Sequence, residues 1–338
     1  MQLVLHDFDL PLRHPFTTSI ETKTVQPTLI VELRDGTLSG YGEATANPYY
    51  GVTTAGLRDV LESARAEIEA FRLLDPPSFW QAMQPLLAGH PFAQCALDEA
   101  AHDLWGKRLG QPVYKLWGLS IDAAPHSDYT IGLDTIERML AKLAECPDWP
   151  VYKIKLGTPD DLAIVHELRQ HTMATFRVDA NTAWTVEETI ANTHRMRELG
   201  VEFIEQPLPA ADWEGMSRVF AETVLPIVAD ESCIVEADVA KCHRHFHGVN
   251  IKLTKCGGLT PARRMIAEAR RLEMKVMVGC MVESSVGISA IAQLLPLLDY
   301  VDMDGALLIA RDVASGVRVD RGCVNYPAWP GCGVRLLG

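Results

Sequence analysis

Polar and apolar residues alternate along the first 50 residues with the two-residue period of β-strands. Two such runs, 29–33 and 38–43, flank the turn signal Arg34-Asp-Gly36, which predicts a β-hairpin. Helical segments follow at about 54–71, 78–87 and 93–109, and the last has an apolar face with a 3.6-residue period. We therefore expect an α+β unit over the first 120 residues.

From about residue 126, short apolar runs alternate with amphipathic helical stretches. Such stretches occur at 160–171, 186–199, 260–272 and 285–295. Eight strands with helices between them predict a (β/α) barrel. The alternative is a doubly wound open sheet, and the absence of a glycine-rich G-x-G-x-x-G loop after any strand argues against it. The predicted strands are 128–131, 151–156, 175–178, 202–204, 227–229, 249–253, 275–278 and 300–303.

The composition adds limits to this fold prediction. Hydrophobic residues make up 48% and charged residues 22% of the chain, as in globular proteins, and the net charge of −13 argues against nucleic acid and anionic membranes as partners. No signal peptide and no long apolar run is apparent, and the eight cysteines include no C-x-x-C pair, so we expect reduced thiols and a cytoplasmic location. His243, His245 and His247 lie in one short segment without a second ligand cluster, which argues against a closed metal site there.

Charged residues stand where the predicted barrel strands end, which is where such barrels carry their catalytic groups. Three consecutive strands end in Asp179, Glu205 and Asp230. Adjacent carboxylates repel one another unless a cation lies between them, and oxygen ligands favour Mg²⁺ or Mn²⁺. Acids that merely cap the following helices are the alternative, which accounts for one of the three but not for all.

Lysines flank these carboxylates along the chain. Lys153 and Lys155 are two residues apart on one strand, so their side chains share a face, and close like charges are expected to lower each other's pKa. An edge strand with solubilising lysines is the alternative. Lys252 ends the sixth strand, on the other side of the carboxylates. One lysine that removes an α-proton and another that returns it to the opposite face would racemise or epimerise a carboxylate by 1,1-proton transfer.

The ordered motifs resemble the enolase superfamily, muconate-lactonising-enzyme subgroup, whose lysine bases and Mg²⁺-stabilised ene-diolate are a known pattern. The motifs that carry the resemblance are Lys153-Ile-Lys155, Asp179-Ala-Asn181, Glu205-Gln-Pro207, Asp230-Glu-Ser232 and Asn250-Ile-Lys252.

This resemblance implies a fold and a set of roles. The fold would be an α/β protein, a (β/α)7β TIM-like barrel over 121–304 with an N-terminal α+β capping domain with lid loops over 1–120 and a C-terminal segment, 305–338, that returns to the cap. Lys155 and Lys252 would be the acid/base pair and Lys153 would lie beside the substrate carboxylate, whereas Lys255 is not the residue that the pattern selects. The metal ligands would be Asp179, Glu205 and Asp230, with Mg²⁺ or Mn²⁺ as the cofactor.

The eighth strand narrows the expected reaction. Asp302 and Asp304 are two residues apart and so face the same way, and a pair of acids suits the α-ammonium of a dipeptide. This Asp-x-Asp resembles the signature of dipeptide epimerases, which implies a Mg²⁺-dependent isomerase that inverts the α-carbon of the C-terminal residue of L-Ala-Xaa dipeptides through an ene-diolate. Two acids exposed to water at a strand end are the alternative for the pair. An N-acylamino-acid racemase or o-succinylbenzoate synthase is the alternative enzyme, and a non-catalytic metal-dependent binding protein or a structural α/β protein is the alternative from another class.

Specificity residues follow from the same resemblance. Thr130 would bond the substrate backbone and Glu283 would face the pocket. In family members that act on Ala-Glu, a lid arginine meets the glutamate, and Glu21 stands in its place unless the alignment shifts to Lys23. Glu21 would repel a glutamate, so Xaa is expected not to be strictly Glu but neutral or cationic. The expected partner is a small-molecule dipeptide, with homo-oligomerisation left open.

Overall fold

The computed structural model describes residues 1–17, 22–122 and 124–337, and an antiparallel sheet begins the chain. Its strands β1 (Gln2–Thr17), β2 (Thr22–Asp35) and β3 (Leu38–Thr45) pair in that order. The predicted hairpin is confirmed, because β2 and β3 pair antiparallel around Gly36, whose φ of 60° suits a tight turn.

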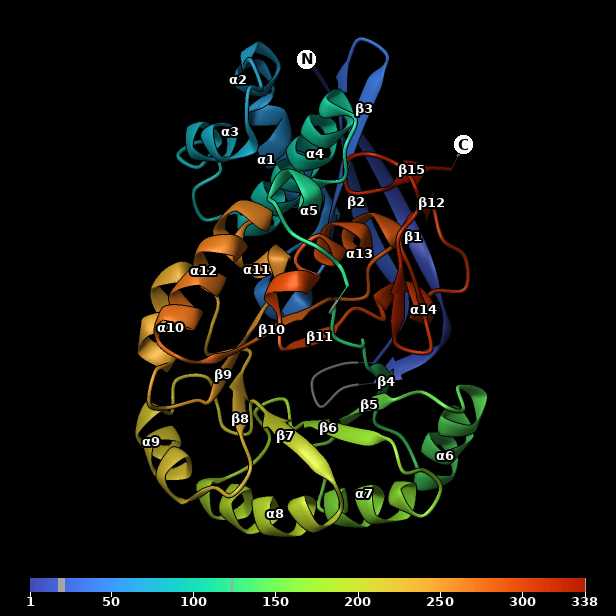
Figure 1. Ribbon diagram of the computed structural model, residues 1–338, viewed down its shortest axis with the longest axis vertical. Helices are drawn as coiled ribbons and strands as arrows, with labels where there is room; N and C mark the ends of the chain where they lie inside the picture. The colour runs from blue at the N-terminus through green and yellow to red at the C-terminus, as the bar shows by residue number, and fades with distance from the viewer. Residues whose placement is uncertain (18–21, 123, 338) are drawn as a thin grey trace.

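Helices cover one face of this sheet (Figure 1). The segment predicted as one helix over 54–71 is two helices divided at Ala64, whose φ of −97° and ψ of 3° are not helical. The longest helix packs against β3 at Gly40 and Gly42, where an added Cβ would lie 2.2 Å from Ala100 O and 2.0 Å from Ala96 O. The helices of this cap are η1 (Pro48–Tyr50), α1 (Thr54–Ser63), α2 (Arg65–Ala70), α3 (Pro76–Met83), α4 (Pro91–Leu109) and α5 (Val113–Leu116).

A parallel eight-stranded barrel forms the other layer (Figure 1). Its strands are β4 (Tyr129–Ile131), β5 (Val151–Lys155), β6 (Thr175–Asp179), β7 (Val201–Glu205), β8 (Ile227–Ala229), β9 (Gly248–Ile251), β10 (Lys275–Gly279) and β11 (Tyr300–Asp302). They pair in sequence order, and a bridge between Ser127 and Val301 brings the two ends together, so the barrel prediction is confirmed and the doubly wound alternative is wrong.

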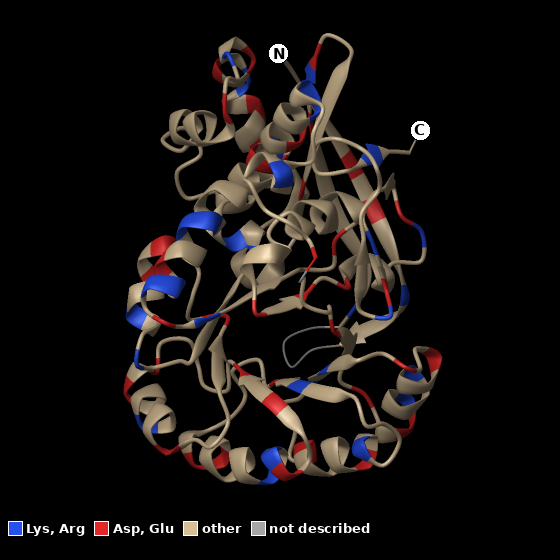
Figure 2. Ribbon diagram, viewed as in Figure 1, with Lys and Arg blue, Asp and Glu red and all other residues tan. Residues whose placement is uncertain are grey.

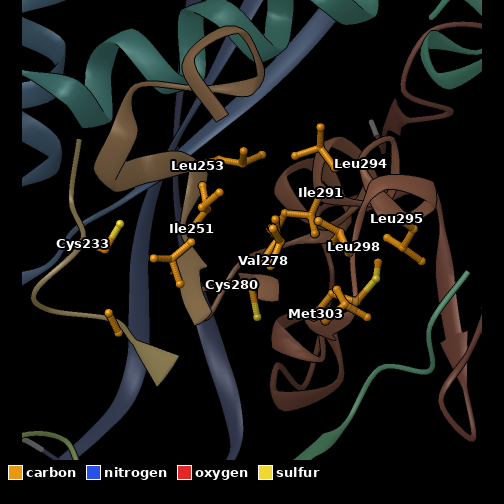
Figure 3. Close-up of a cluster of buried hydrophobic side chains, with 14 of the residues drawn as sticks. Cys233, Ile251, Leu253, Val278, Cys280, Ile291, Leu294, Leu295, Leu298 and Met303 are labelled. Carbon is orange, nitrogen blue, oxygen red and sulfur yellow. The ribbon is translucent and has the colours of Figure 1, made fainter. Parts of the chain in front are cut away.

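Amphipathic helices surround the barrel and carry charged residues along their outer faces (Figure 2). They are α6 (Ile136–Glu145), α7 (Asp161–Arg169), α8 (Val186–Glu198), α9 (Trp213–Glu222), α10 (Glu236–Cys242), α12 (Leu259–Arg271) and α13 (Ser285–Ala292), with the short α11 (Leu253–Cys256), η2 (Leu295–Leu297) and α14 (Gly305–Leu308). Figure 3 shows how the layers pack, with Ile251 and Val278 of the barrel strands near Ile291 of α13. In the described part of the chain, no helix has the length and apolar character needed to cross a membrane.

The C-terminal residues contact the long cap helix α4. Lys107 of α4 donates to Val334 O at 3.0 Å, and Cys332 N donates to Asp103 Oδ1 at 2.8 Å. Two small antiparallel pairs stabilise this segment, which ties the long cap helix to the end of the chain. The strands are β12 (Ala314–Ser315), β13 (Arg318–Asp320), β14 (Cys323–Asn325) and β15 (Arg335–Leu336), paired β12–β15 and β13–β14.

Candidate active site

A cavity of about 120 Å³ lies at the C-terminal ends of the barrel strands, beneath the cap. Phe16 and Tyr49 line it from the cap, and charged strand ends line it from the barrel. The residues selected from sequence that line it include Thr130, Lys153, Lys155, Lys252, Asp302 and Asp304.

The three strand-end carboxylates come together at the base of this mouth. Asp179 is 0%, Glu205 0% and Asp230 2% exposed, and one oxygen of each lies within 4.8 Å of the others. The β-sheet register sets Asp179 directly beside Glu205. The helix-cap alternative is wrong for all three, since the N-cap residues of the following helices are Thr185, Asp212 and Val235.

Each carboxylate has one oxygen held by a fixed donor and its other oxygen near a lysine of the site. The first set of bonds is Asn181 N to Asp179 Oδ1 at 2.9 Å, Asn250 Nδ2 to Glu205 Oε1 at 2.8 Å, and Lys255 Nζ to Asp230 Oδ1 at 2.5 Å. The second set of oxygens is met by lysine ammonium groups. The fixed donors of the first set orient the carboxylate ligands before a cation binds.

Lys153 lies at the middle of the carboxylates. Its Nζ is 2.8 Å from Asp302 Oδ2, 2.9 Å from Glu205 Oε2 and 3.3 Å from Asp179 Oδ2. Burial acts to lower the pKa of Lys153, but the carboxylates, Asp302 first, outweigh burial and hold this pKa well above its usual value. The prediction that Lys155 lowers the pKa of Lys153 therefore does not describe the net effect, because the carboxylates raise this pKa.

Lys155 and Lys252 lie on two sides of the same centre. Lys155 Nζ is 2.6 Å from Asp179 Oδ2, and Lys252 Nζ is 2.7 Å from Asp230 Oδ2. Burial lowers and Asp230 raises the pKa of Lys252, with a net rise. The edge-strand alternative is wrong, because β5 lies between β4 and β6 and all five of its residues are buried.

The electrostatics of the carboxylates favour a bound cation. Burial, and then Asp179, raise the pKa of Glu205 to about 7. Glu205 Oε2 makes no hydrogen bond of acceptable geometry within the described chain, although Lys153 Nζ lies 2.9 Å away. The contact with Lys153 is one of charge, and this buried oxygen keeps lone pairs with which to bind an ion. Three buried carboxylate oxygens are a donor set that fits a hard divalent ion such as Mg²⁺.

Asp302 and Asp304 form a second acidic pair beside the cavity. They are 5% and 1% exposed, so the alternative of a water-exposed strand end is wrong. Asp304 Oδ2 accepts from Thr130 N at 2.6 Å, and burial together with Asp302 raises the pKa of Asp304 to about 7. Burial raises the pKa of Asp302, but Lys153 outweighs it and the net pKa is lowered. Cys280, which sequence reasoning missed, has its Sγ within 4.8 Å of both acids and lines the cavity; its position directly after a barrel strand was the available signal.

The structure places one predicted specificity residue, Glu283, differently from the expectation. Glu21 lies outside the described residues. Against the expectation that Glu283 faces the pocket, its carboxylate accepts from Met281 N at 2.8 Å and is not among the described side chains that line the cavity. Burial and Glu43 raise the pKa of Glu283 to about 8.

Lys23, near the start of β2, lines the cavity. Its Nζ donates to Gln26 Oε1 at 2.9 Å, and Gln26 is itself anchored by a 2.8 Å bond from its Nε2 to Ala46 O. The alternative alignment, with Lys23 at the specificity position, therefore has a side chain at the cavity wall.

Glu231 is another residue of the cavity that sequence reasoning passed over. It is 7% exposed, its Oε1 lies 3.4 Å from Asn181 Nδ2, and its Oε2 has no hydrogen-bond partner among the described residues. Its place directly after Asp230 was the available signal.

The three histidines do not gather into a metal site within the described residues. His245 packs its ring edge-on against Trp213, and His247 Nδ1 accepts from Ile227 N at 3.1 Å. Their contacts are those of packing residues.

Two family models match the chain. The "Mandelate racemase / muconate lactonizing enzyme, N-terminal domain" matches residues 2–118, and "Enolase C-terminal domain-like" matches residues 135–337. Together they span the cap and the barrel.

Known relatives are similar over the full length. The L-Ala-D/L-amino acid epimerase of Flavobacterium johnsoniae is 54% identical over 337 residues, with 100% of each chain covered. A substrate-liganded complex of the L-Ala-D/L-Glu epimerase from Bacillus subtilis superposes with a TM-score of 0.92 at 27% identity, covering 99% of this chain and 98% of that one. The dipeptide epimerase from Cytophaga hutchinsonii, complexed with Mg and D-Ala-L-Val, superposes with a TM-score of 0.94 at 25% identity, covering 100% and 96%.

Proposed function

The chain belongs to the mandelate racemase/muconate lactonizing enzyme family of the enolase superfamily and is an isomerase of the dipeptide-epimerase kind, and from this premise we propose that it inverts the α-carbon of the C-terminal residue of L-Ala-Xaa dipeptides by two-base 1,1-proton transfer. The observation that carries the proposal is the buried pair Asp302 and Asp304, which lines the same cavity as Lys155 and Lys252 and is joined to the three carboxylates through Lys153.

The acidic pair supports a dipeptide over an acylated amino acid. A dipeptide presents an α-ammonium, which two buried carboxylates bind by charge-assisted hydrogen bonds. An acylated amino acid has no such cation, and the contact of Lys153 with Asp302 would then be left to offset two buried acids. This distinction favours the epimerase over the alternative N-acylamino-acid racemase or o-succinylbenzoate synthase.

A divalent cation, Mg²⁺ with Mn²⁺ as a substitute, is the cofactor that the donor set fits. The oxygens that would hold it are those facing the shared centre on Asp179, Glu205 and Asp230. When bound, the cation supplies positive charge that stabilises the carboxylate of the deprotonated substrate and offsets the acids that raise the pKa of the lysines. Lys153 adds a fixed positive charge beside that carboxylate.

Lys155 and Lys252 would move the proton. They approach the centre from β5 and from the end of β9, paired with different carboxylates, so one amine faces each side of a substrate between them. One lysine takes the α-proton as an amine and the other delivers a proton as an ammonium, so the carbon inverts. Thr130, whose backbone is tied to Asp304, lies where it can bond the substrate backbone.

The second residue of the dipeptide is the finer part of the proposal. Glu21, on which the prediction of a neutral or cationic Xaa rests, lies outside the described residues. The cation Lys23 lines the cavity, together with apolar Phe16 and Leu308 and the aromatic Tyr49. We therefore propose that Xaa is not strictly Glu. The enzyme would accept a broad range of side chains at Xaa and would favour neutral side chains and side chains with oxygen acceptors over cationic ones.

Incubation of a dipeptide pool with Mg²⁺ in D₂O tests this function. We expect one deuterium at the α-carbon of the C-terminal residue together with inversion, detected by mass spectrometry and chiral analysis. Acylated amino acids exchanging in place of dipeptides would favour the racemase. No exchange in the intact protein would favour a binding protein.

Lysine variants test the two-base step. Lys155→Ala and Lys252→Ala should each lower epimerisation by about 10²- to 10⁴-fold. Each variant should still exchange the α-proton of one epimer, because the remaining lysine faces one side of the carbon. Lys241→Ala, at a lysine with a 62% exposed side chain, is the matched control. Exchange of both epimers by both catalytic variants would argue against two bases.

We also propose the division into a cap over 1–120, a barrel over 121–304 and a returning segment over 305–338, in which the cap closes the cavity. Self-association and a cytoplasmic location stay predictions.

A further inference from the structure

Lys255 is a buried lysine with no role in the proton transfer. It lies in α11, directly after the strand that carries Asn250 and just beyond Lys252, and is 1% exposed. Its Nζ donates to Asp230 Oδ1 at 2.5 Å, to Asp230 O at 2.6 Å and to Cys233 O at 3.0 Å. An ammonium has three hydrogens, so its donors are all used within the protein.

Asp230 is held between two lysines that differ in kind. Lys252 bonds Oδ2 and lines the cavity, whereas Lys255 bonds Oδ1 and is absent from the described lining of that cavity. Two of the three acceptors of Lys255 are backbone carbonyls, which fix its position. Lys252 therefore faces the cavity, and Lys255 does not.

We propose that Lys255 is a positioning residue that occupies Asp230 Oδ1, leaves only Oδ2 to the metal and thereby makes the site selective for Mg²⁺ over Ca²⁺. The proposal rests on the metal site of the proposed function. A carboxylate with one oxygen tied to a buried ammonium binds a metal through a single oxygen. Mg²⁺ requires near-octahedral geometry and short bonds, whereas Ca²⁺ takes more oxygens and accepts both oxygens of one carboxylate.

The other two carboxylates follow the same arrangement with weaker donors. Glu205 is held by the side-chain amide of Asn250, and Asp179 by the backbone of Asn181. Of these three fixed donors, Lys255 is the charged one. A charge-assisted hydrogen bond is about twice as strong as a neutral one. The loss of Lys255 should therefore change how Asp230 binds an ion more than the loss of a neutral donor would.

Titration calorimetry of the full-length, metal-stripped protein with Mg²⁺ and separately with Ca²⁺ tests the proposal without substrate. In Lys255→Met we expect Mg²⁺ affinity to fall about 10- to 100-fold, the usual effect of losing an outer partner of a metal ligand. We expect Ca²⁺ affinity to fall less or to rise, so that the Mg²⁺/Ca²⁺ affinity ratio drops at least about tenfold, because Asp230 can then offer both oxygens. Lys255→Gln keeps a neutral donor and should lie between.

The controls separate positioning from general damage. Lys241→Met, an exposed lysine, should match the intact protein. Both cations weakened by the same factor, or a Mg²⁺ affinity within about twofold of the intact protein, would overturn the proposal. If Lys255→Met fails to fold, the ratio in Lys255→Gln decides.

The same measurements distinguish this proposal from the proposed function. Intact protein that binds no Mg²⁺ overturns the selectivity inference together with the metal site. Intact protein that binds Mg²⁺ with the predicted selectivity but exchanges no dipeptide α-proton leaves this inference standing and the epimerase function refuted. At saturating Mg²⁺, Lys255→Gln should regain most of its kcat, as expected for a residue that acts through the metal.

Discussion

The ionisation of each side chain in the cavity depends on the opposite charges beside it. Burial acts to raise the pKa of every carboxyl there. The opposing charges of the lysines decide which carboxyls remain ionised. Asp230, between Lys252 and Lys255, has a pKa held well below its usual value, because their charges outweigh burial. Asp304 accepts from Thr130 N, but burial, and then Asp302 beside it, raise its pKa to about 7. The charge of the ammonium-binding pair therefore changes near neutral pH.

This titration predicts a pH-dependent KM. Below pH of about 7 Asp304 is protonated, and above it the residue is an anion, so the KM for a dipeptide should fall as pH rises through that value. Asp304→Asn should have a KM higher by about ten- to a hundredfold above pH 7, the loss of one bond to a charged group, and should lose this pH dependence. Steady-state kinetics of both proteins from about pH 6 to about pH 8 measure it. Asp320→Asn, at an exposed acid, is the control, and an unchanged pH profile in Asp304→Asn would refute the assignment.

At the scale of elements, the cap is positioned by the close contact between β3 and α4. Gly40 and Gly42 point at the backbone of α4, so that the strand and helix approach without side chains between them. The next residue, Glu43, is buried and accepts from Ser284 N and Gly287 N at the start of α13. Its carboxylate thus satisfies free N–H groups of a barrel helix. The position of β3 on α4 consequently sets the position of the cap on the barrel.

Gly42→Ala tests this contact. A methyl group there would lie 2.0 Å from Ala96 O, so strand and helix must separate, and we expect a loss of at least about 1–3 kcal/mol in the free energy of unfolding. Denaturant unfolding measures it. Gly56→Ala in α1, where the nearest atom is the Thr53 hydroxyl at 3.2 Å, is the matched control and should be close to neutral. Equal stability of the two variants would contradict the packing argument.

For the whole molecule, the interface between cap and barrel holds three buried acids. Glu99 of α4 accepts from Glu43 N at 3.0 Å, and burial and then Glu283 raise the pKa of Glu99 well above its usual value. Glu283 belongs to the barrel side, directly before the N-cap of α13. The two halves of the molecule are thus joined through carboxyl groups whose pKa values burial raises.

From this interface we predict that the free energy of unfolding falls as pH rises. The pKa of Glu283 is about 8 in the folded protein against 4.5 when exposed, so between these values the folded state binds more protons and the free energy of unfolding falls as pH rises. Glu283→Gln removes this titration. Relative to the intact protein it should gain stability between pH of about 5 and about 8, on the order of 3 kcal/mol. Urea unfolding at both pH values measures it, and parallel pH trends in the two proteins would contradict it.

Metal binding should stabilise the whole molecule. An ion bound only by the folded protein contributes about 2.7 kcal/mol at a concentration a hundred times its Kd. The Tm should therefore rise with Mg²⁺ and return after chelation. Asp230→Asn, which removes a carboxylate from the group of three, should lose most of this rise. An equal rise in Asp230→Asn would place the stabilising ion elsewhere.

The sequence by itself determined the barrel, its strands and the strand-end acids. Parallel strands and the two-residue period of side chains are local properties, and the ends of consecutive strands must meet at one mouth, so Asp179, Glu205 and Asp230 could be grouped from their spacing. Only the tertiary structure decided which atoms these side chains contact. Lys255 lies beyond its strand, in α11, and reaches Asp230 from there, and Glu283 accepts from Met281 N and lies near Glu99 and Glu43 of the cap. Burial and the charges of distant residues set the pKa values of Lys153 and Asp304, and neither is encoded in local spacing.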